Sequence, residues 1–144
     1  MNSFEFTHTM SLLPYHYNAK IVKVTDGDTI IAEIDLGFHT NVTKIIRVYQ
    51  DSESVYFDTP ETRLYRGVTE EHKQHGLEAT ERAKELLLGK DVIIHTYKKG
   101  SFRWLGEIYY PVIKMDSHGT PTWWSYVETM ISEGFQKKDK YPEE

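Results

Sequence analysis

The stretch AKIVKVTDGDTIIAEIDLG, residues 19–37, decides the fold because it predicts two strands joined by a tight turn. Apolar side chains occupy every other position of its second half, at Ile30, Ala32, Ile34 and Leu36. Such period-two alternation is typical of a strand with one buried face. Asp26 and Gly27 supply the turn, since glycine adopts positive φ without steric cost. We therefore expect a β-hairpin with the acidic turn DGDT, residues 26–29, at its tip.

The remainder of the chain predicts three more strands and two helices. Strands are expected at TKIIRVY (43–49), DVIIHTYK (91–98) and FRWLGEIYYPVIK (102–114). In the strand at 43–49, Ile46 and Val48 lie on one face and Arg47 lies on the other. Helices are expected at residues 70–88 and over the whole of TWWSYVETMISEGF (122–135), closed by Gly89 and Gly134. The first helix has a repeating face made of Leu77, Thr80, Ala83, Lys84 and Leu87.

This order of elements predicts an α+β fold that is mainly β. Five short strands with a helix between the third and fourth favour a five-stranded OB-type β-barrel with two to three helices. We expect one domain at residues 18–137, preceded by an N-terminal arm (1–17) and followed by a charged tail (138–144).

Composition excludes several classes of protein. The chain has 144 residues, of which 39% are hydrophobic, and no apolar run approaches the length of a membrane span. There is no cysteine, so neither a disulfide framework nor thiol chemistry is available. No signal peptide is evident, which favours the cytoplasm, and we expect a monomer. The net charge of −5 argues against broad, non-specific nucleic-acid binding, although a small basic site remains compatible with it.

Two short acidic motifs carry the candidate chemistry. DGDT (26–29) alone is explained by a hairpin turn, and FDTPE (57–61) alone by the start of a helix or turn. Together they place Asp28 at the start of one strand and Asp58 at the end of another, where the two carboxylates can meet. Two carboxylates and a backbone carbonyl make a hard oxygen site, and water and a substrate phosphate can complete the ligands of Ca²⁺.

Phosphodiester cleavage also needs a base and cations. Glu61 follows Asp58 by three positions and can address a water molecule at such a site. Arg47 and Arg103 lie in expected strands, where a guanidinium can grip two phosphate oxygens.

Four motifs in order, VTDGDTI, RVY…FDTPET, GLEATERAKELL and FRWLGEIYY, resemble the staphylococcal (thermonuclease) nuclease family across roughly residues 18–137. The resemblance implies an OB-type barrel and a calcium-dependent endonuclease that hydrolyses phosphodiester bonds of DNA and RNA. By motif position it implies that Asp28 and Asp58 are carboxylate ligands of Ca²⁺ and that Thr59 supplies its carbonyl. It also implies Glu61 as general base, Arg47 and Arg103 as phosphate clamps, and Asp26 as an outer support of the metal.

The spacing of the first arginine departs from the family pattern. Arg47 precedes Asp58 by 11 positions, and removing QDSESV (50–55) leaves RVYYFDTPE, in which the distance is the family's five. Either this extra segment loops out, or the strand slides and Glu53 replaces Arg47, which would impair catalysis. We expect looping out, because the segment is polar. Val48-Tyr49 recurs as Val55-Tyr56, so two similar segments can compete for one strand position.

A second departure is Phe102, which stands where the family usually has glycine before its second arginine. His72 and His75 have a spacing that can bind metal, but a solvated helix face is the simpler explanation. The sequence is therefore compatible with three functions: a metal-dependent nuclease, a non-catalytic module that binds nucleic acid or protein, and a nuclease scaffold with a regulatory or engineered insertion.

Overall fold

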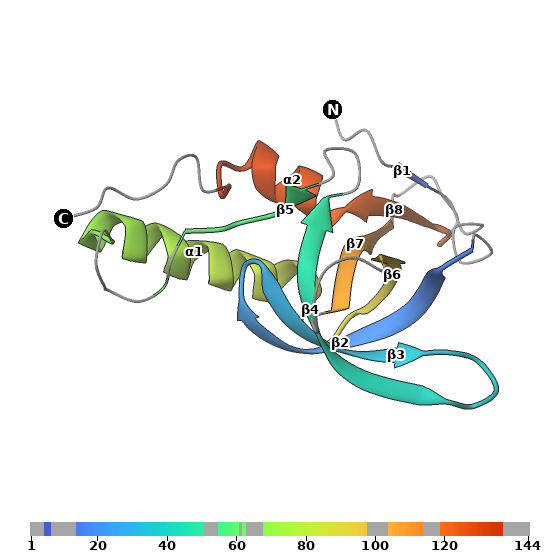
Figure 1. Ribbon diagram of the computed structural model, residues 1–144. Coiled ribbons are helices and arrows are strands. Elements are labelled where there is room, and N and C mark those ends of the chain that lie inside the picture. The colour runs from blue at the N-terminus through green and yellow to red at the C-terminus, as the bar shows by residue number, and fades with distance from the viewer. Residues whose placement is uncertain are drawn as a thin grey trace.

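A computed structural model describes residues 5–6, 14–50, 55–60, 62, 68–97, 104–113 and 119–136 of the chain (Figure 1). Its strands are β1 (Glu5–Phe6), β2 (His16–Asp26), β3 (Thr29–Asp35), β4 (Asn41–Gln50), β5 (Val55–Tyr56), β6 (Asp91–Tyr97), β7 (Trp104–Ile113) and β8 (Pro121–Ser125). The two helices of the described part are α1 (Glu70–Leu87) and α2 (Tyr126–Ser132).

Five of the strands close into a mixed barrel. Antiparallel pairs join β4 to β3, β3 to β2, β2 to β6 and β6 to β7. A parallel pair between β4 and β7 closes the ring, with Ile46 opposite Trp104. β8 extends the sheet beyond β7 and carries β1. The prediction of a mainly β, α+β fold with a five-stranded OB-type barrel is confirmed.

The barrel interior follows the alternation in the sequence. Ile30, Ala32 and Ile34 of β3 are fully buried, and so are Ile46 and Val48 of β4. Leu36, which the alternation also assigned to this row, is 39% exposed because β3 ends at Asp35. Burial of this apolar surface is the main force that holds the barrel together.

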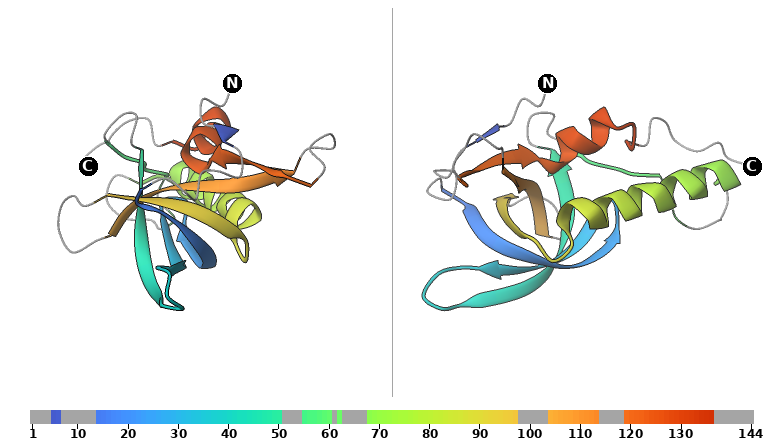
Figure 2. Two further views of the ribbon diagram at one scale, coloured as in Figure 1. Left: turned by 90° about the vertical axis from the view of Figure 1, so that its right-hand side faces the viewer. Right: turned by 180° about the vertical axis from the view of Figure 1, so that it is seen from behind.

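Helix α1 packs against β2 and extends past the barrel on one side (Figures 1 and 2). Its bounds agree with the prediction, and Gly89 adopts the positive φ of 74° expected after a helix end. The buried face is shifted from the predicted one. It consists of Gly76, Ala79, Thr80, Ala83, Leu86 and Leu87. Leu77 is instead 40% exposed.

His72 has a capping role in this helix. Thr69 is the N-cap, its hydroxyl accepts from the backbone N–H of His72, and His72 Nδ1 accepts from the backbone N–H of Thr69. His75 packs its ring against Phe135, with centroids 5.5 Å apart. These contacts give His72 a part in the N-terminal cap and His75 a part in packing against Phe135.

The expected helix over residues 122–135 is wrong in its first part. Residues 121–125 form strand β8, which pairs with β7 from Tyr109↔Ser125 to Ile113↔Pro121. Aromatic and β-branched residues favour a strand. The edge of β7 offers backbone hydrogen bonds to these residues, so they pair with it instead of forming a helix. Ser125 then caps α2 by accepting a hydrogen bond from the N–H of Glu128, and Gly134 ends the helix at φ 86°.

Strand β4 keeps Arg47 in a defined register. Arg47 lies opposite Thr29 of β3 and opposite Leu105 of β7. The two Val-Tyr segments are partners: Tyr49 pairs with Tyr56 across the β4–β5 hairpin. Glu53 lies outside the described residues, and Arg47 is the residue beside the β2–β3 turn.

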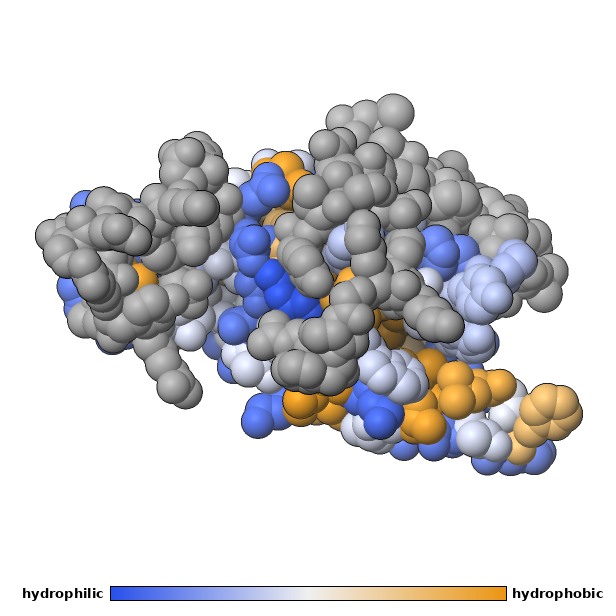
Figure 3. All heavy atoms as spheres, in the orientation of Figure 1, coloured by the Kyte–Doolittle hydropathy of each residue, from blue (hydrophilic) through white to orange (hydrophobic). Residues whose placement is uncertain are grey.

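The hairpin that joins β3 to β4 carries exposed apolar side chains on the face seen in Figure 3. Phe38 at its tip is fully exposed and has a φ of 54°, and Ile45 is 59% exposed. Over the ranges that the structure describes, no helix is both long enough and apolar enough to cross a membrane.

Candidate functional site

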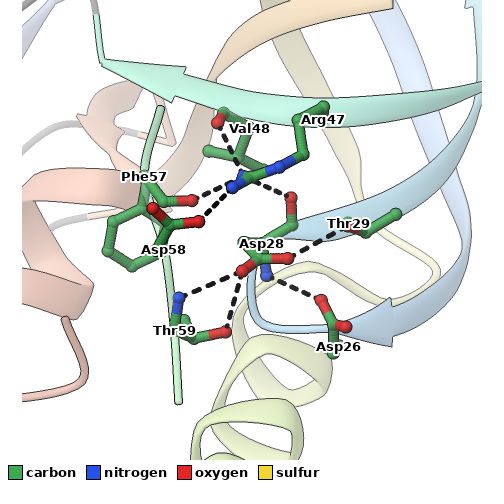
Figure 4. Close-up of polar contacts among 8 residues, drawn as sticks. All are labelled: Asp26, Asp28, Thr29, Arg47, Val48, Phe57, Asp58 and Thr59. Atoms are coloured by element: carbon green, nitrogen blue, oxygen red, sulfur yellow. Dashed lines mark hydrogen bonds and ion pairs between the residues drawn. The ribbon is translucent and has the colours of Figure 1, made fainter. Parts of the chain in front are cut away.

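The turn between β2 and β3 carries the first two acids. Asp26 pairs with Thr29, so Gly27 and Asp28 occupy the turn itself. The backbone N–H of Asp28 donates to Asp26 Oδ1 at 3.1 Å, and the Thr29 hydroxyl donates to Asp28 Oδ1 at 3.0 Å (Figure 4). The first bond ties the Asp28 backbone to the Asp26 carboxylate, and the second holds the Asp28 carboxylate toward Thr29.

The reason for glycine in this turn differs from the one predicted. Gly27 is not among the glycines with positive φ. A Cβ atom at this position would instead lie 2.5 Å from Thr59 Cγ2 and 2.9 Å from Thr59 Oγ1. Gly27 is therefore required by the close approach of the segment that carries the other motif.

Thr59 joins the two motifs directly. Its backbone N–H donates to Asp28 Oδ2 at 3.1 Å, and its hydroxyl donates to the same oxygen at 3.4 Å (Figure 4). Thr59 is only 3% exposed. The prediction that Asp28 and Asp58 come from neighbouring segments thus agrees with the geometry, and Thr59 is the residue that connects them.

Arg47 lies between the two acidic segments. Its Nη1 donates to the carbonyls of Phe57 (2.5 Å), Val48 (3.1 Å) and Asp28 (3.3 Å), and its Nη2 donates to Asp58 Oδ1 in an ion pair. The arginine side chain is 11% exposed and the Asp58 side chain is 56% exposed. Asp58 therefore faces solvent while its partner is anchored in the barrel wall.

Among the residues that the structure describes, acids outnumber cations at this place. Asp28 and Asp58 contact Arg47, and Asp26 lies close enough to feel its charge. Burial, and then the hydrogen bond and negative charge of Asp28, raises the pKa of Asp26 from its usual 3.8 to about 7.

Tyr126 is a residue that sequence reasoning missed. The side chain is fully buried, and its hydroxyl donates to the carbonyl of Gly27 at 2.5 Å. Burial, and then the charges of Asp28 and Asp26, raises the pKa of Tyr126 well above its usual value, so the phenol keeps its proton and acts as donor. No local pattern could have revealed this contact, because 99 positions separate the two residues.

Three of the predicted site residues cannot be placed. Glu61, Arg103 and Glu53 lie outside the described residues. Within the described ranges, no group of three or more histidine, cysteine, aspartate or glutamate side chains could hold a metal ion. A cation here would thus need donors beyond the side chains of Asp28 and Asp58.

The donor chemistry nevertheless fits a hard cation. Carboxylate oxygens of Asp28 and Asp58 and the backbone carbonyl of Thr59 are the oxygen ligands that Ca²⁺ prefers, and it tolerates irregular geometry and several water ligands. The arrangement can bring together a cation, a guanidinium and an anionic ligand. A scan against protein-family models and a search of curated proteins both found no match for this chain.

Proposed function

We propose that this protein is a calcium-dependent endonuclease that hydrolyses phosphodiester bonds of DNA and RNA. The observation that carries the proposal is the cluster in which Thr59 links the two acidic segments and Arg47 contacts both of them. The resemblance to the staphylococcal nuclease family motivates the choice of reaction, and the OB-type barrel agrees with it.

Asp28, Asp58 and the Thr59 carbonyl would hold Ca²⁺. When bound, this ion would withdraw negative charge from the phosphate that is attacked. Thr29 and Thr59 orient the Asp28 carboxylate through three hydrogen bonds. The role of Asp26 is to support the turn by accepting from the N–H of Asp28.

Arg47 would bind the substrate phosphate and stabilise its growing charge. Its Nη2 group now pairs with Asp58, so a substrate phosphate would share or take over this donor. In the proposal Glu61 takes a proton from the attacking water, and Arg103 provides a second cationic contact; both roles rest on the resemblance alone.

The proposed impairment by segment 50–55 depends on displacement of Arg47. The contacts of Arg47 with Asp58 and with the Asp28 carbonyl lend no support to such a displacement. Catalysis by the intact chain is therefore the form of the proposal that the geometry favours.

A plasmid-digestion assay tests the proposal. Cleavage is expected with Ca²⁺, weaker cleavage with Mg²⁺, which demands a stricter octahedron, and none with EDTA. Asp28→Asn keeps the shape and removes a charge, so Ca²⁺ affinity should fall. Asp35→Asn, at the far end of strand β3, which begins directly after Asp28, is the matched control. Equal Ca²⁺ titration curves for parent and Asp28→Asn would refute the assignment of this ligand.

A second candidate is a non-catalytic module that binds nucleic acid or protein. It is favoured by the satisfied hydrogen bonds of Arg47, which suit a structural arginine that needs no substrate. Glu61→Gln separates the two candidates. A nuclease should lose roughly two to four orders of magnitude in rate while binding of a nucleotide bisphosphate changes far less. A binding module should show no metal-dependent cleavage in either protein.

A further inference from the structure

One tyrosine touches both acidic segments from the interior of the protein. Tyr126, the first residue of α2, donates its hydroxyl to the Gly27 carbonyl at 2.5 Å. Gly27 lies between Asp26 and Asp28 and is buried, so its carbonyl needs a partner from within the protein. Tyr126 supplies that partner.

The ring of the same residue reaches the other segment. It meets the ring of Phe57 edge to face, with centroids 6.1 Å apart and planes at 82°. Phe57 directly precedes Asp58, is fully buried, and gives its carbonyl to Arg47 Nη1. A single rigid side chain therefore contacts the residues next to Asp28 and next to Asp58.

Contacts of Thr59 with Gly27 and Asp28 leave the β2–β3 turn little freedom to move. Thr59 presses on Gly27 so closely that no Cβ fits there, and it also holds the Asp28 carboxylate. Gly27 is thus contacted both by Thr59 and by the Tyr126 hydroxyl. If the hydroxyl is lost, the turn keeps only one of these two supports.

We propose that Tyr126 is a positioning residue for the cation site. From the interior of the protein, its side chain fixes the turn that carries Asp28 relative to the segment that carries Asp58. The inference rests on the proposed function for the identity of the ligand. Its structural part, that the hydroxyl orders the turn, holds for the chain without any ligand. Tyr126 does not itself contact a cation or substrate in this proposal.

The test compares Tyr126→Phe with Tyr110→Phe. Each variant keeps the ring and removes one hydroxyl from the region of α2, since the Tyr110 hydroxyl bonds to Thr129 Oγ1 at 2.8 Å. Global unfolding in urea should report similar losses for the two. The backbone amide of Asp28 donates to the Asp26 carboxylate, and that of Thr59 donates to the Asp28 carboxylate. Hydrogen exchange at these two amides should be faster only in Tyr126→Phe.

Ca²⁺ titration calorimetry is the second readout. Tyr126→Phe should weaken binding by about tenfold, the effect of one net hydrogen bond, and Tyr110→Phe should change it less than about twofold. Equal exchange at the two amides and equal Ca²⁺ affinity in both variants would overturn the inference. If the parent binds no Ca²⁺, the proposed ligand is wrong, and the exchange comparison still decides whether Tyr126 orders the turn.

A measurement on the unaltered chain covers the case in which Tyr126→Phe does not fold. Tyrosine labelled with ¹³C at Cζ reports on each hydroxyl by NMR. Addition of Ca²⁺ should shift the Tyr126 resonance and leave that of Tyr110 in place. The same response, or none, at both tyrosines would count against the proposal.

Discussion

Replacement of Gly27 by alanine should destabilise the protein and disturb the acidic cluster together. A Cβ atom at Gly27 would lie 2.5, 2.9 and 3.0 Å from the Cγ2, Oγ1 and Cβ atoms of Thr59. Threonine is β-branched and stiff, and Thr59 is buried, so it cannot rotate out of the way cheaply. The backbone must therefore separate at the point where Thr59 bonds to Asp28.

The magnitude follows from two opposing terms. Overpacking of this kind costs about 1–3 kcal/mol. Because Gly27 does not have a positive φ, alanine also reduces the entropy of the unfolded chain, which stabilises by about 0.4–1 kcal/mol. The net loss in free energy of unfolding should be about 1–2 kcal/mol, and Ca²⁺ affinity should fall as well.

Two further variants make this result specific. Gly106→Ala creates a similar clash inside the barrel, where Cβ would lie 2.8 Å from Ile94 Cγ2, so it should lose stability without affecting Ca²⁺ binding. Thr59→Ser removes the nearest methyl group, and the double variant with Gly27→Ala should show a favourable coupling of about 1 kcal/mol. Urea unfolding followed by tryptophan fluorescence measures these quantities. A Gly27→Ala protein as stable as the parent, or zero coupling with Thr59→Ser, would refute the reasoning.

Two other predictions follow from the same region. Asp26 has a folded-state pKa raised to about 7, so the folded protein binds more protons than the unfolded chain between about pH 4 and 7, and ionisation of Asp26 removes stability as the pH rises through this range. Asp26→Asn should therefore be more stable than the parent at about pH 8 and lose this advantage near pH 4 in urea titrations; a difference that is constant with pH would contradict the shift. Deletion of residues 50–55 joins Tyr49 to Tyr56, and the bond from the Phe57 N–H to the Val48 carbonyl (3.2 Å) can close the shortened turn. The deletion variant should be at least as active as the parent in plasmid digestion, and lost activity with an intact fold would show that the segment contributes to function.

Local patterns in the sequence were sufficient for most of the scaffold. The alternation from Ile30 to Ile34 indicated which face of β3 is buried, and helical spacing with Gly89 indicated the bounds of α1. The two acidic motifs also pointed to Asp28 and Asp58 as neighbours. Each of these inferences needs only the chemistry of residues a few positions apart, since a strand or a helix repeats over short distances.

Local patterns failed where a partner elsewhere in the chain decided the outcome. The residues Thr122, Trp123 and Trp124 were expected to begin a helix, but they pair with β7 and form part of strand β8. Leu77 has helical spacing, yet α1 turns a different face toward β2. Propensity is weak compared with the burial and pairing that a completed sheet offers.

The arrangement of the candidate site depends on contacts between distant parts of the chain. The requirement for Gly27 comes from Thr59, the position of Arg47 from its bonds to Phe57 and Asp58, and the rear support of the turn from Tyr126. The sequence alone was enough to propose which residues carry the chemistry, because acidic residues and arginines can be recognised from their residue type and from the short motifs that contain them. Only the closed barrel decides how they meet, because atoms separated by up to 99 positions come within hydrogen-bond distance when the strands between them are paired.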